Sequence, residues 1–410
     1  MQLFSFIIAF ILALFLISKN VNMGLSLIIA AFVTGITYFE NLKGLLITIL
    51  EGMFSSLSIE LMIIVGLISG LGYIMKVTGD LDQMLNSLNA LLKNIKVLLM
   101  VVPALIGTLN IPGGAILSAP MIAESGKKVQ LDKVNQNSIN LFFRHIGFFI
   151  YPLYPTMILT AELLDVSIIS IIKYTFFVML TGIIAAYPVM LKNVKNQQKP
   201  KEDGKFIGNV KSFISGFAPI IIILILALLL NIPFHYALFL GVVFALCKKT
   251  SKNSVFFTVI KKRIRDFIVI GVDYQLVFTI AGLMAFKNVI EDTGVVNEIA
   301  QIIIEFGVPL PFLVCGLGLL AGYVSGVHMA AIGILGPLFA PMLTGGINTA
   351  VYAALLFTTI NVGYLISPLH LCLVLGNEYF DVDIGPVYRK LSIPLMIMII
   401  FSLIQVYLFA

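Results

Sequence analysis

Long apolar segments recur from one end of the chain to the other, and they constrain its fold more than any other feature. Hydrophobic residues make up 60% of the 410 positions and charged residues 11%, whereas a soluble domain carries roughly 25% charged residues. A helix needs about 20 apolar residues to cross the hydrocarbon layer of a bilayer. We therefore predict an all-α polytopic membrane protein whose main partner is the lipid bilayer, with about ten crossings.

Two of the apolar segments contain a breaker in the middle. Segment 97–123 is interrupted at Asn110-Ile111-Pro112-Gly113-Gly114, and segment 310–343 at Ser325-Gly326. Each leaves two short arms, which suit a re-entrant helical hairpin better than one full span; the alternative is an ordinary helix kinked by Gly or Pro. The twelve apolar segments are 3–17, 23–39, 59–75, 97–122, 139–162, 168–190, 213–230, 236–247, 267–286, 310–343, 349–375 and 391–408.

Charged residues gather in the connections between these segments. Residues 192–211 and 248–266 are rich in Lys and Arg, and basic loops stay on the cytoplasmic side. The connection 287–305 is acidic and is predicted to lie outside. The net charge of +6 is therefore explained by topology, and we expect no nucleic-acid partner. The chain divides into residues 1–191, a cytoplasmic linker at 192–211, and residues 212–410.

The two halves resemble each other in sequence. With an offset of 216 residues, segment 147–168 matches segment 363–384 at nine of 22 positions, including glycine, proline, glutamate and aspartate in register. Each half contains five spans and one hairpin, so the second half must lie upside down relative to the first. Inverted repeats with broken helices are typical of secondary transporters, which bind substrate near the midplane where the halves meet.

Some motifs resemble those of a known family. The stretch from Asn361 through Gly363, Ser367 and Pro368 to Cys372, together with the breaker at 110–114, is similar to an uncharacterised prokaryotic membrane family, the domain of unknown function 401. The architecture resembles the ion transporter superfamily of gluconate permeases, dicarboxylate symporters, arsenite permeases and sodium/proton antiporters. The resemblance implies a prokaryotic plasma-membrane protein, a homodimer, and a site between the hairpin tips and the helix breaks.

The chain departs from the dicarboxylate branch of that superfamily at these points. That branch has Ser-Asn-Thr triplets, whereas this chain has Thr108-Leu109-Asn110 and Ser325-Gly326-Val327. The difference argues against a dicarboxylate as the substrate.

Two further segments should interrupt their helices. Pro152 and Pro368 each remove a backbone hydrogen bond and clash with the preceding turn, so 147–155 and 363–370 should not be regular helix. Asn361 and Ser367 would add side-chain oxygens beside the freed carbonyls and could hold Na⁺ or a substrate hydroxyl. A kink that serves packing alone is the alternative.

Ionisable residues at membrane depth are costly and are functional candidates. His145, His328 and His370 lie at a predicted break or tip and suit proton coupling, although each could simply bond across helices. Arg144 could neutralise an anion or extend to the cytoplasmic edge. The candidate binding residues are Thr108, Asn110, Pro112, Gly113, Gly114, His145, Ser325, Gly326, His328, Asn361, Gly363, Ser367, Pro368 and His370, with Arg144 as a candidate anion partner.

Other functional classes have little support in the sequence. Cys247, Cys315 and Cys372 lie far apart, so we expect small buried hydrophobes and no metal site. Walker, zinc-protease and serine-hydrolase motifs are missing, so we predict no enzyme and no cofactor. The sequence favours a secondary transporter for a small anion, such as an organic acid, driven by H⁺ or Na⁺. The alternatives are a cation/proton antiporter on the same fold, and a channel or non-transporting membrane partner.

Overall fold

The structure is a computed structural model, and it confirms the prediction of an all-helical chain. It describes residues 2–19, 21–92, 94–108, 115–192, 194, 206–230, 232–248, 256–295, 307–343 and 348–410. Within these residues the chain forms helices and no strand.

The helices of the first half are α1 (Gln2–Ser18), α2 (Met23–Gly35), α3 (Leu42–Phe54), α4 (Ser56–Val77), α5 (Asp80–Leu91), α6 (Ile95–Gly107), α7 (Ala115–Lys128), α8 (Lys133–Ile146), α9 (Pro155–Leu163) and α10 (Ile168–Ala186). Those of the second half are α11 (Phe206–Leu224), α12 (Phe234–Cys247), α13 (Phe256–Asp266), α14 (Tyr274–Thr293), α16 (Leu310–Ser325), α17 (His328–Phe339), α18 (Thr349–Leu365), α19 (Leu371–Phe380) and α20 (Ile384–Phe409). Short π-helical turns extend α10, α11 and α13.

Several helices are long and apolar enough to cross a membrane. In the described part of the chain there are four: Ser56–Val77, Ile168–Leu191, Phe206–Ala227 and Ile384–Phe409. A fifth span results if Phe257–Gly271 and α14, which meet at a bend of 53°, cross the membrane together. Large apolar side chains are exposed along these helices, including Ile184, Ile207 and Tyr407. Both features are consistent with a membrane protein. Ten crossings in two inverted sets stay a prediction.

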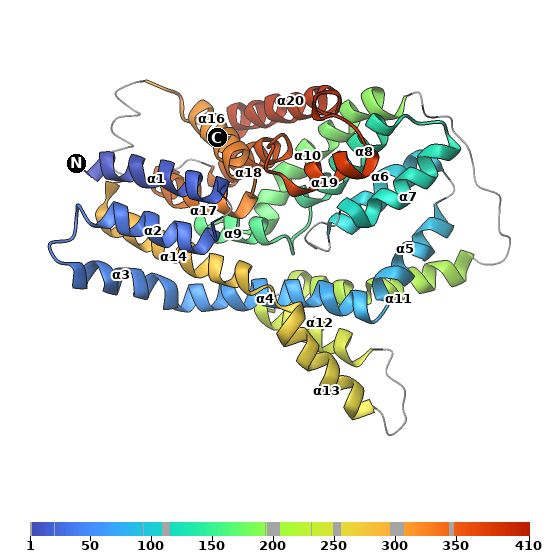
Figure 1. Ribbon diagram of the computed structural model, residues 1–410, viewed down its shortest axis with the longest axis horizontal. Coiled ribbons are helices and arrows are strands. Elements are labelled where there is room, and N and C mark those ends of the chain that lie inside the picture. Colours follow the sequence, from blue (N-terminus) through green and yellow to red (C-terminus); the bar gives the residue numbers. More distant parts are fainter. Residues whose placement is uncertain are drawn as a thin grey trace.

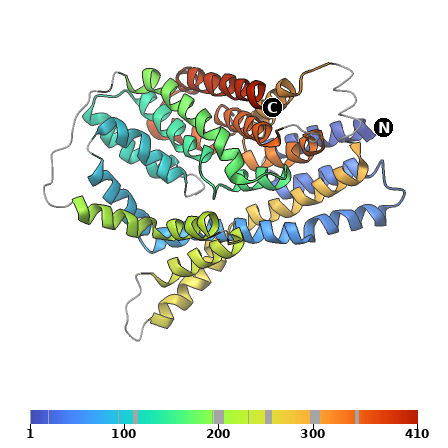
Figure 2. The ribbon, with the colours of Figure 1, turned by 180° about the vertical axis from the view of Figure 1, so that it is seen from behind.

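The helices form an elongated body from which one helical pair projects. Figure 1 shows α3 and α4 along one edge with α14 beside them, and α14 also packs against α2. Helices α6, α8, α10, α18 and α20 lie on the other side of the body, and α17 packs between α9 and α14. Helices α12 and α13 extend away from this body in both views (Figure 1 and Figure 2).

Close helix contacts recur at matching places in the two halves. In the first half α6 packs on α8, where Gly107 lies against the Arg144 carbonyl. In the second half α16 packs on α18, where Gly322 lies against the Ile360 carbonyl. Glycine lets the two helices approach this closely. A side chain at either position would therefore collide with the backbone of the neighbouring helix. Gly322 follows Gly107 by 215 residues, and Ile360 follows Arg144 by 216 residues.

The predicted helix breaks lie where proline requires them. Helix α8 passes into a 3-10 turn at Gly147–Phe149, and α9 begins at Pro155, so Pro152 lies in non-helical chain. Helix α18 continues to Leu365, two residues beyond the predicted start of its break, and α19 begins at Leu371. The expectation for Pro152 and Pro368 is thus confirmed, with the second break shorter than predicted.

Some segments predicted as connections are helical. Residues 256–266 of the predicted loop 248–266 form α13, and residues 206–211 of the predicted linker belong to α11. Helices α3 and α5 also lie outside the predicted spans. The error has one cause, since each of these helices carries charged residues, which the search for uninterrupted apolar spans excludes.

A buried ion pair joins the two halves away from the breaks. Asp80, at the start of α5, accepts hydrogen bonds from Lys248 Nζ (2.8 Å) and Thr78 Oγ1 (3.0 Å) and is fully buried. Lys248 also donates to the Ser215 carbonyl of α11, on which α5 packs. Buried charges need such partners, because desolvation is otherwise costly.

Candidate functional site

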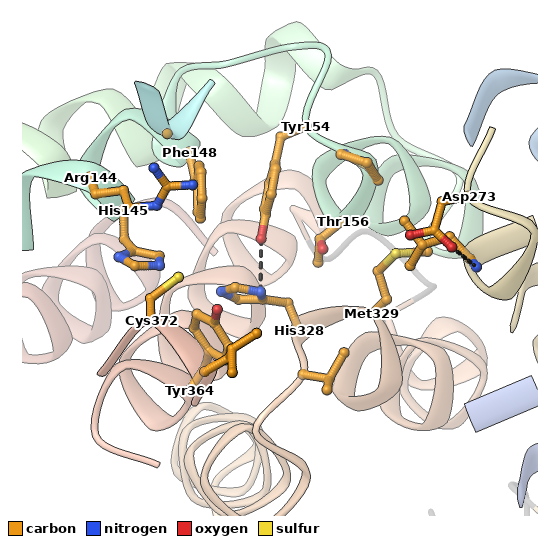
Figure 3. Close-up of a pocket in the computed structure, with 15 residues that line it drawn as sticks. Arg144, His145, Phe148, Tyr154, Thr156, Asp273, His328, Met329, Tyr364 and Cys372 are labelled. Atoms are coloured by element: carbon orange, nitrogen blue, oxygen red, sulfur yellow. Dashed lines mark hydrogen bonds between the residues drawn. The ribbon is translucent and has the colours of Figure 1, made fainter. Parts of the chain in front are cut away.

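A cavity of about 200 Å³ lies where the two broken helices meet. Its lining comes from both halves of the chain, and its lining side chains are mostly buried. Figure 3 shows Arg144 and His145 at one end, Asp273 at the other, and Tyr154, His328 and Thr156 between them. The lining residues are Gly107, Arg144, His145, Phe148, Tyr154, Pro155, Thr156, Asp273, Leu276, Val327, His328, Met329, Tyr364, Leu371 and Cys372.

Three aromatic rings pack together at one wall of the cavity, and two of them, Tyr364 and His328, line it. The ring of Tyr364 lies between those of His328 and His370, with centroid distances of 3.4 Å and 3.8 Å. His328 Nδ1 is hydrogen-bonded to the Tyr154 hydroxyl at 2.8 Å, and its Nε2 has no partner among the described residues (Figure 3). His328 follows the break between α16 and α17, so this bond ties that break to the one before α9.

His145 and Arg144 bring positive or protonatable groups to the same wall. The His145 ring meets the His370 ring edge to face at 4.8 Å, so the structure gathers the three predicted histidines at one place. Arg144 is 3% exposed and lines the cavity. The neighbouring helices enclose its side chain, which favours the role of an anion partner, and its level relative to the cytoplasmic edge stays a prediction.

A contact between two rings recurs at matching places in the halves. Phe148 stacks on Tyr154, with ring centroids 4.0 Å apart and planes 12° apart. The residues 216 positions later are Tyr364 and His370, whose rings are 3.8 Å apart and tilted by 38°. In each half an aromatic residue before the break thus packs on a ring after it, which holds the break in a fixed shape.

Other predicted residues have local structural partners outside the cavity lining. Ser367 donates to the Tyr323 carbonyl of α16 at 2.6 Å, and Ser325 donates to the Ala321 carbonyl at 2.6 Å. Asn361 donates to the Phe357 carbonyl, and its Oδ1 has no partner among the described residues. Thr108 donates to the Leu105 carbonyl.

The remaining predicted residues are glycines and prolines of the breaks. Gly326 has a φ of +59°, which favours glycine, and its Cα lies against Leu369 and Ser367. Gly363 lies against the backbone of α16, and Pro368 is exposed. The predicted tip residues Asn110, Pro112, Gly113 and Gly114 lie outside the described residues.

Several residues of the cavity are absent from the predicted site. Phe148, Tyr154 and Tyr364 look like ordinary aromatic residues of apolar segments, although the 216-residue repeat pairs them with each other and with His370. Cys372 is partly exposed rather than buried as predicted, and it lies beside His145 (Figure 3) in a group of residues that could hold a metal ion. Asp273 caps α14 by accepting from the backbone N–H groups of Gln275 and Leu276.

Comparison with known protein families places the chain in a group without an assigned activity. Residues 1–409 match the family described as protein of unknown function (DUF401). The chain belongs to this family. The cavity is therefore a feature of a DUF401 protein, and the uncharacterised family suggested by the motifs at 110–114 and 361–372 is confirmed. None of the curated proteins compared with this DUF401 member matches it. A likeness to the ion transporter superfamily stays a prediction.

Proposed function

We propose that this protein is a secondary active transporter for a small anion in a prokaryotic plasma membrane, driven by H⁺ or Na⁺. The observation that carries the proposal is the cavity between the two helix breaks, which Arg144, His145 and His328 line, with His370 packed behind it on the rings of His145 and Tyr364. A guanidinium stays charged and offers a planar set of donors that fits a carboxylate or an oxyanion. Neutral histidines can add N–H donors, and protonated histidines add charge.

Two features of the fold support an origin in inverted repeats. The glycine contacts at Gly107 and Gly322 and the ring pairs 148–154 and 364–370 recur at a constant separation in the sequence. Secondary transporters bind their substrate at the interface of such repeats, beside broken helices whose freed backbone groups contact it. A cavity lined by residues of both halves, beside the two breaks, agrees with such a binding place.

A cation/proton antiporter on the same fold is less well supported. Such a protein needs a carboxylate that is free to bind the ion inside the membrane. Asp273 is the only acidic residue among those that line the cavity in the described part of the chain, and its Oδ1 already caps α14. The opposite end of the cavity carries Arg144, which would repel Na⁺ or K⁺, because no carboxylate of the described residues lines that end to offset the charge.

Ligand-induced thermal stabilisation of the purified protein tests the proposal. Carboxylates, sugar acids and inorganic oxyanions would each be added with and without Na⁺. At least one should raise the melting temperature, because a ligand at a hundred times its Kd stabilises the folded state by about 2.7 kcal/mol. Arg144→Gln should lose this effect, whereas Arg389→Gln should keep it, since Arg389 is exposed on α20. Equal stabilisation of Arg144→Gln, or no stabilisation by any anion, would contradict the proposal.

A further inference from the structure

Three potential metal ligands converge at the Arg144 end of the cavity. His145 comes from the end of α8, while His370 and Cys372 flank the start of α19, so both helix breaks contribute. One ligand atom from each side chain can be chosen so that all three lie within 4.8 Å of one another. We propose that His145, His370 and Cys372 bind a thiophilic d¹⁰ metal ion, Zn²⁺ or Cu⁺.

The hydrogen bond of His145 prepares its ring for a metal. His145 Nδ1 lies 2.6 Å from the Leu141 carbonyl oxygen. A carbonyl only accepts hydrogen bonds, so Nδ1 carries the proton and Nε2 keeps a free lone pair. Metal-binding histidines have this arrangement, in which the second ring nitrogen donates to a carbonyl and fixes the ring.

The ring nitrogens of His370 are buried and unpaired in the described part of the chain. The residue is fully buried, and neither ring nitrogen has a hydrogen-bond partner of good geometry among the described residues. Leaving a buried polar group unpaired costs about 1–3 kcal/mol. A metal ion bound to one of these nitrogens would remove this cost.

The ligand set selects the kind of ion. Two imidazoles and a thiolate suit Zn²⁺ or Cu⁺, whereas Na⁺, Mg²⁺ and Ca²⁺ require oxygen ligands. Ligand atoms around Zn²⁺ lie roughly 3.5 Å apart, given bonds of 2.0 to 2.3 Å. The three side chains must therefore close by about 1 Å, and Cys372 is partly exposed at the edge of the core against which it packs.

The charge balance near Arg144 is compatible with this ion. The Cys372 thiolate cancels the charge of Cu⁺ and leaves a single positive charge with Zn²⁺. The ion is distinct from the coupling ion of the proposed transport cycle, and its binding does not depend on whether the protein transports an anion.

Metal binding to the purified full-length protein tests this site. Zn²⁺ and Cu⁺ are offered separately, in competition with a chromophoric chelator for each ion, and bound metal is measured by elemental analysis. The protein should retain about one equivalent of one of the two ions, and the successful arm identifies it. Cys372→Ser and His370→Gln should each weaken binding by more than about tenfold.

Two matched variants control for general effects on the protein. Cys315→Ser removes a buried cysteine on α16, and His235→Gln removes a histidine that pairs with Glu60 on another face. Both should bind metal like the wild type. Co²⁺ substitution of the wild type should give thiolate-to-cobalt charge transfer, which does not depend on a variant that folds.

Two results would overturn the site. One is the absence of binding in both metal arms together with no charge-transfer absorption from Co²⁺. The other is metal binding by Cys372→Ser that equals binding by Cys315→Ser. Neither result bears on anion stabilisation through Arg144, so the metal site and the proposed function fail separately.

Discussion

At the residue scale, one hydrogen bond connects the two breaks that enclose the cavity. Tyr154 and His328 are both buried, and the Tyr154 hydroxyl is hydrogen-bonded to His328 Nδ1 at 2.8 Å. Because His328 Nε2 already has no partner among the described residues, loss of this bond would leave the whole imidazole unsatisfied there.

Tyr154→Phe should therefore destabilise the protein by about 1–3 kcal/mol, the usual cost of an unpaired buried polar group. The measurement is chemical unfolding in detergent, together with anion-induced stabilisation, which should also weaken. Tyr151→Phe is the control, since Tyr151 is buried nearby and the described structure shows no hydrogen bond from its hydroxyl. Equal stability of both variants would mean that the Tyr154–His328 bond contributes nothing.

The Asp80–Lys248 pair makes a second prediction at this scale. Asp80→Asn should lower the free energy of unfolding by about 3 kcal/mol, because removal of one partner leaves the other charge buried and uncompensated. Asp82→Asn, on the exposed side of the same helix, should change it by less than about 0.5 kcal/mol. Thermal or chemical unfolding of the two variants would decide, and similar values for both would contradict the role of the pair.

The sequence is informative for single residues only where their chemistry is unusual. His145, His328 and His370 stand out because ionisable groups are rare in apolar segments, and they do gather at one place. Tyr364 and Cys372 do not stand out in that way, because both types are common in apolar helices. Only the three-dimensional path of the two breaks brings them to the histidines.

At the element scale, the close approach of α16 and α18 depends on glycine. A Cβ on Gly322 would collide with the Ile360 carbonyl oxygen, which cannot move without shifting the helix. Gly316 lies on the same helix, and a Cβ there would meet no atom of the described residues. The space available for a Cβ, rather than helix propensity, therefore decides which of the two glycines cannot be replaced.

Gly322→Ala should destabilise the protein by about 1–3 kcal/mol, as overpacking of a tight interface does. Gly316→Ala should be neutral or slightly stabilising, because alanine favours helix over glycine by roughly 1 kcal/mol. The melting temperatures of the two variants in detergent test this difference. If the melting temperature of Gly322→Ala equals that of the wild type, α16 and α18 do not pack as described.

Helix positions are predictable from the sequence to the extent that they depend on local chemistry. Pro152 and Pro368 set the breaks, and the 216-residue repeat aligns the two prolines with each other. Helices α5 and α13 escape prediction because their charged residues resemble those of loops. Their helical form depends on amphipathic faces, which a search for apolar spans does not detect.

At the scale of the whole molecule, the two halves share a pattern but differ in exposure. Leu369 of the second break is 43% exposed, whereas its counterpart Leu153 in the first break is 1% exposed. In a transporter of inverted repeats, such asymmetry corresponds to one of two alternating states, since each half takes the conformation of the other when the site changes side.

This asymmetry predicts unequal labelling at paired positions. Leu369→Cys should react quickly with a water-soluble maleimide in membranes, and Leu153→Cys should react slowly. Addition of the transported anion with its coupling ion should change both rates, because the two states interconvert under those conditions. Rates that are equal, or that no anion or coupling ion changes, would argue against alternating access.

The membrane arrangement is the part of the fold that residue patterns and helix lengths specify least. The number of crossings depends on how short helices such as α6 and α16 lie relative to the bilayer, and helix length alone does not decide this. The location of the cavity, in contrast, follows from the two proline breaks and the packing of α8 and α18 around them.

Gradient-driven uptake into proteoliposomes tests the central claim most directly. The anion that stabilises the purified protein is supplied outside, and an inward Na⁺ or H⁺ gradient is imposed. The wild type and Arg389→Gln should accumulate the anion above its external concentration, and Arg144→Gln should accumulate at least about tenfold less, as expected for loss of a charged hydrogen-bond donor. Accumulation by Arg144→Gln at the wild-type level would contradict the account. So would uptake by the wild type that depends on neither the Na⁺ nor the H⁺ gradient.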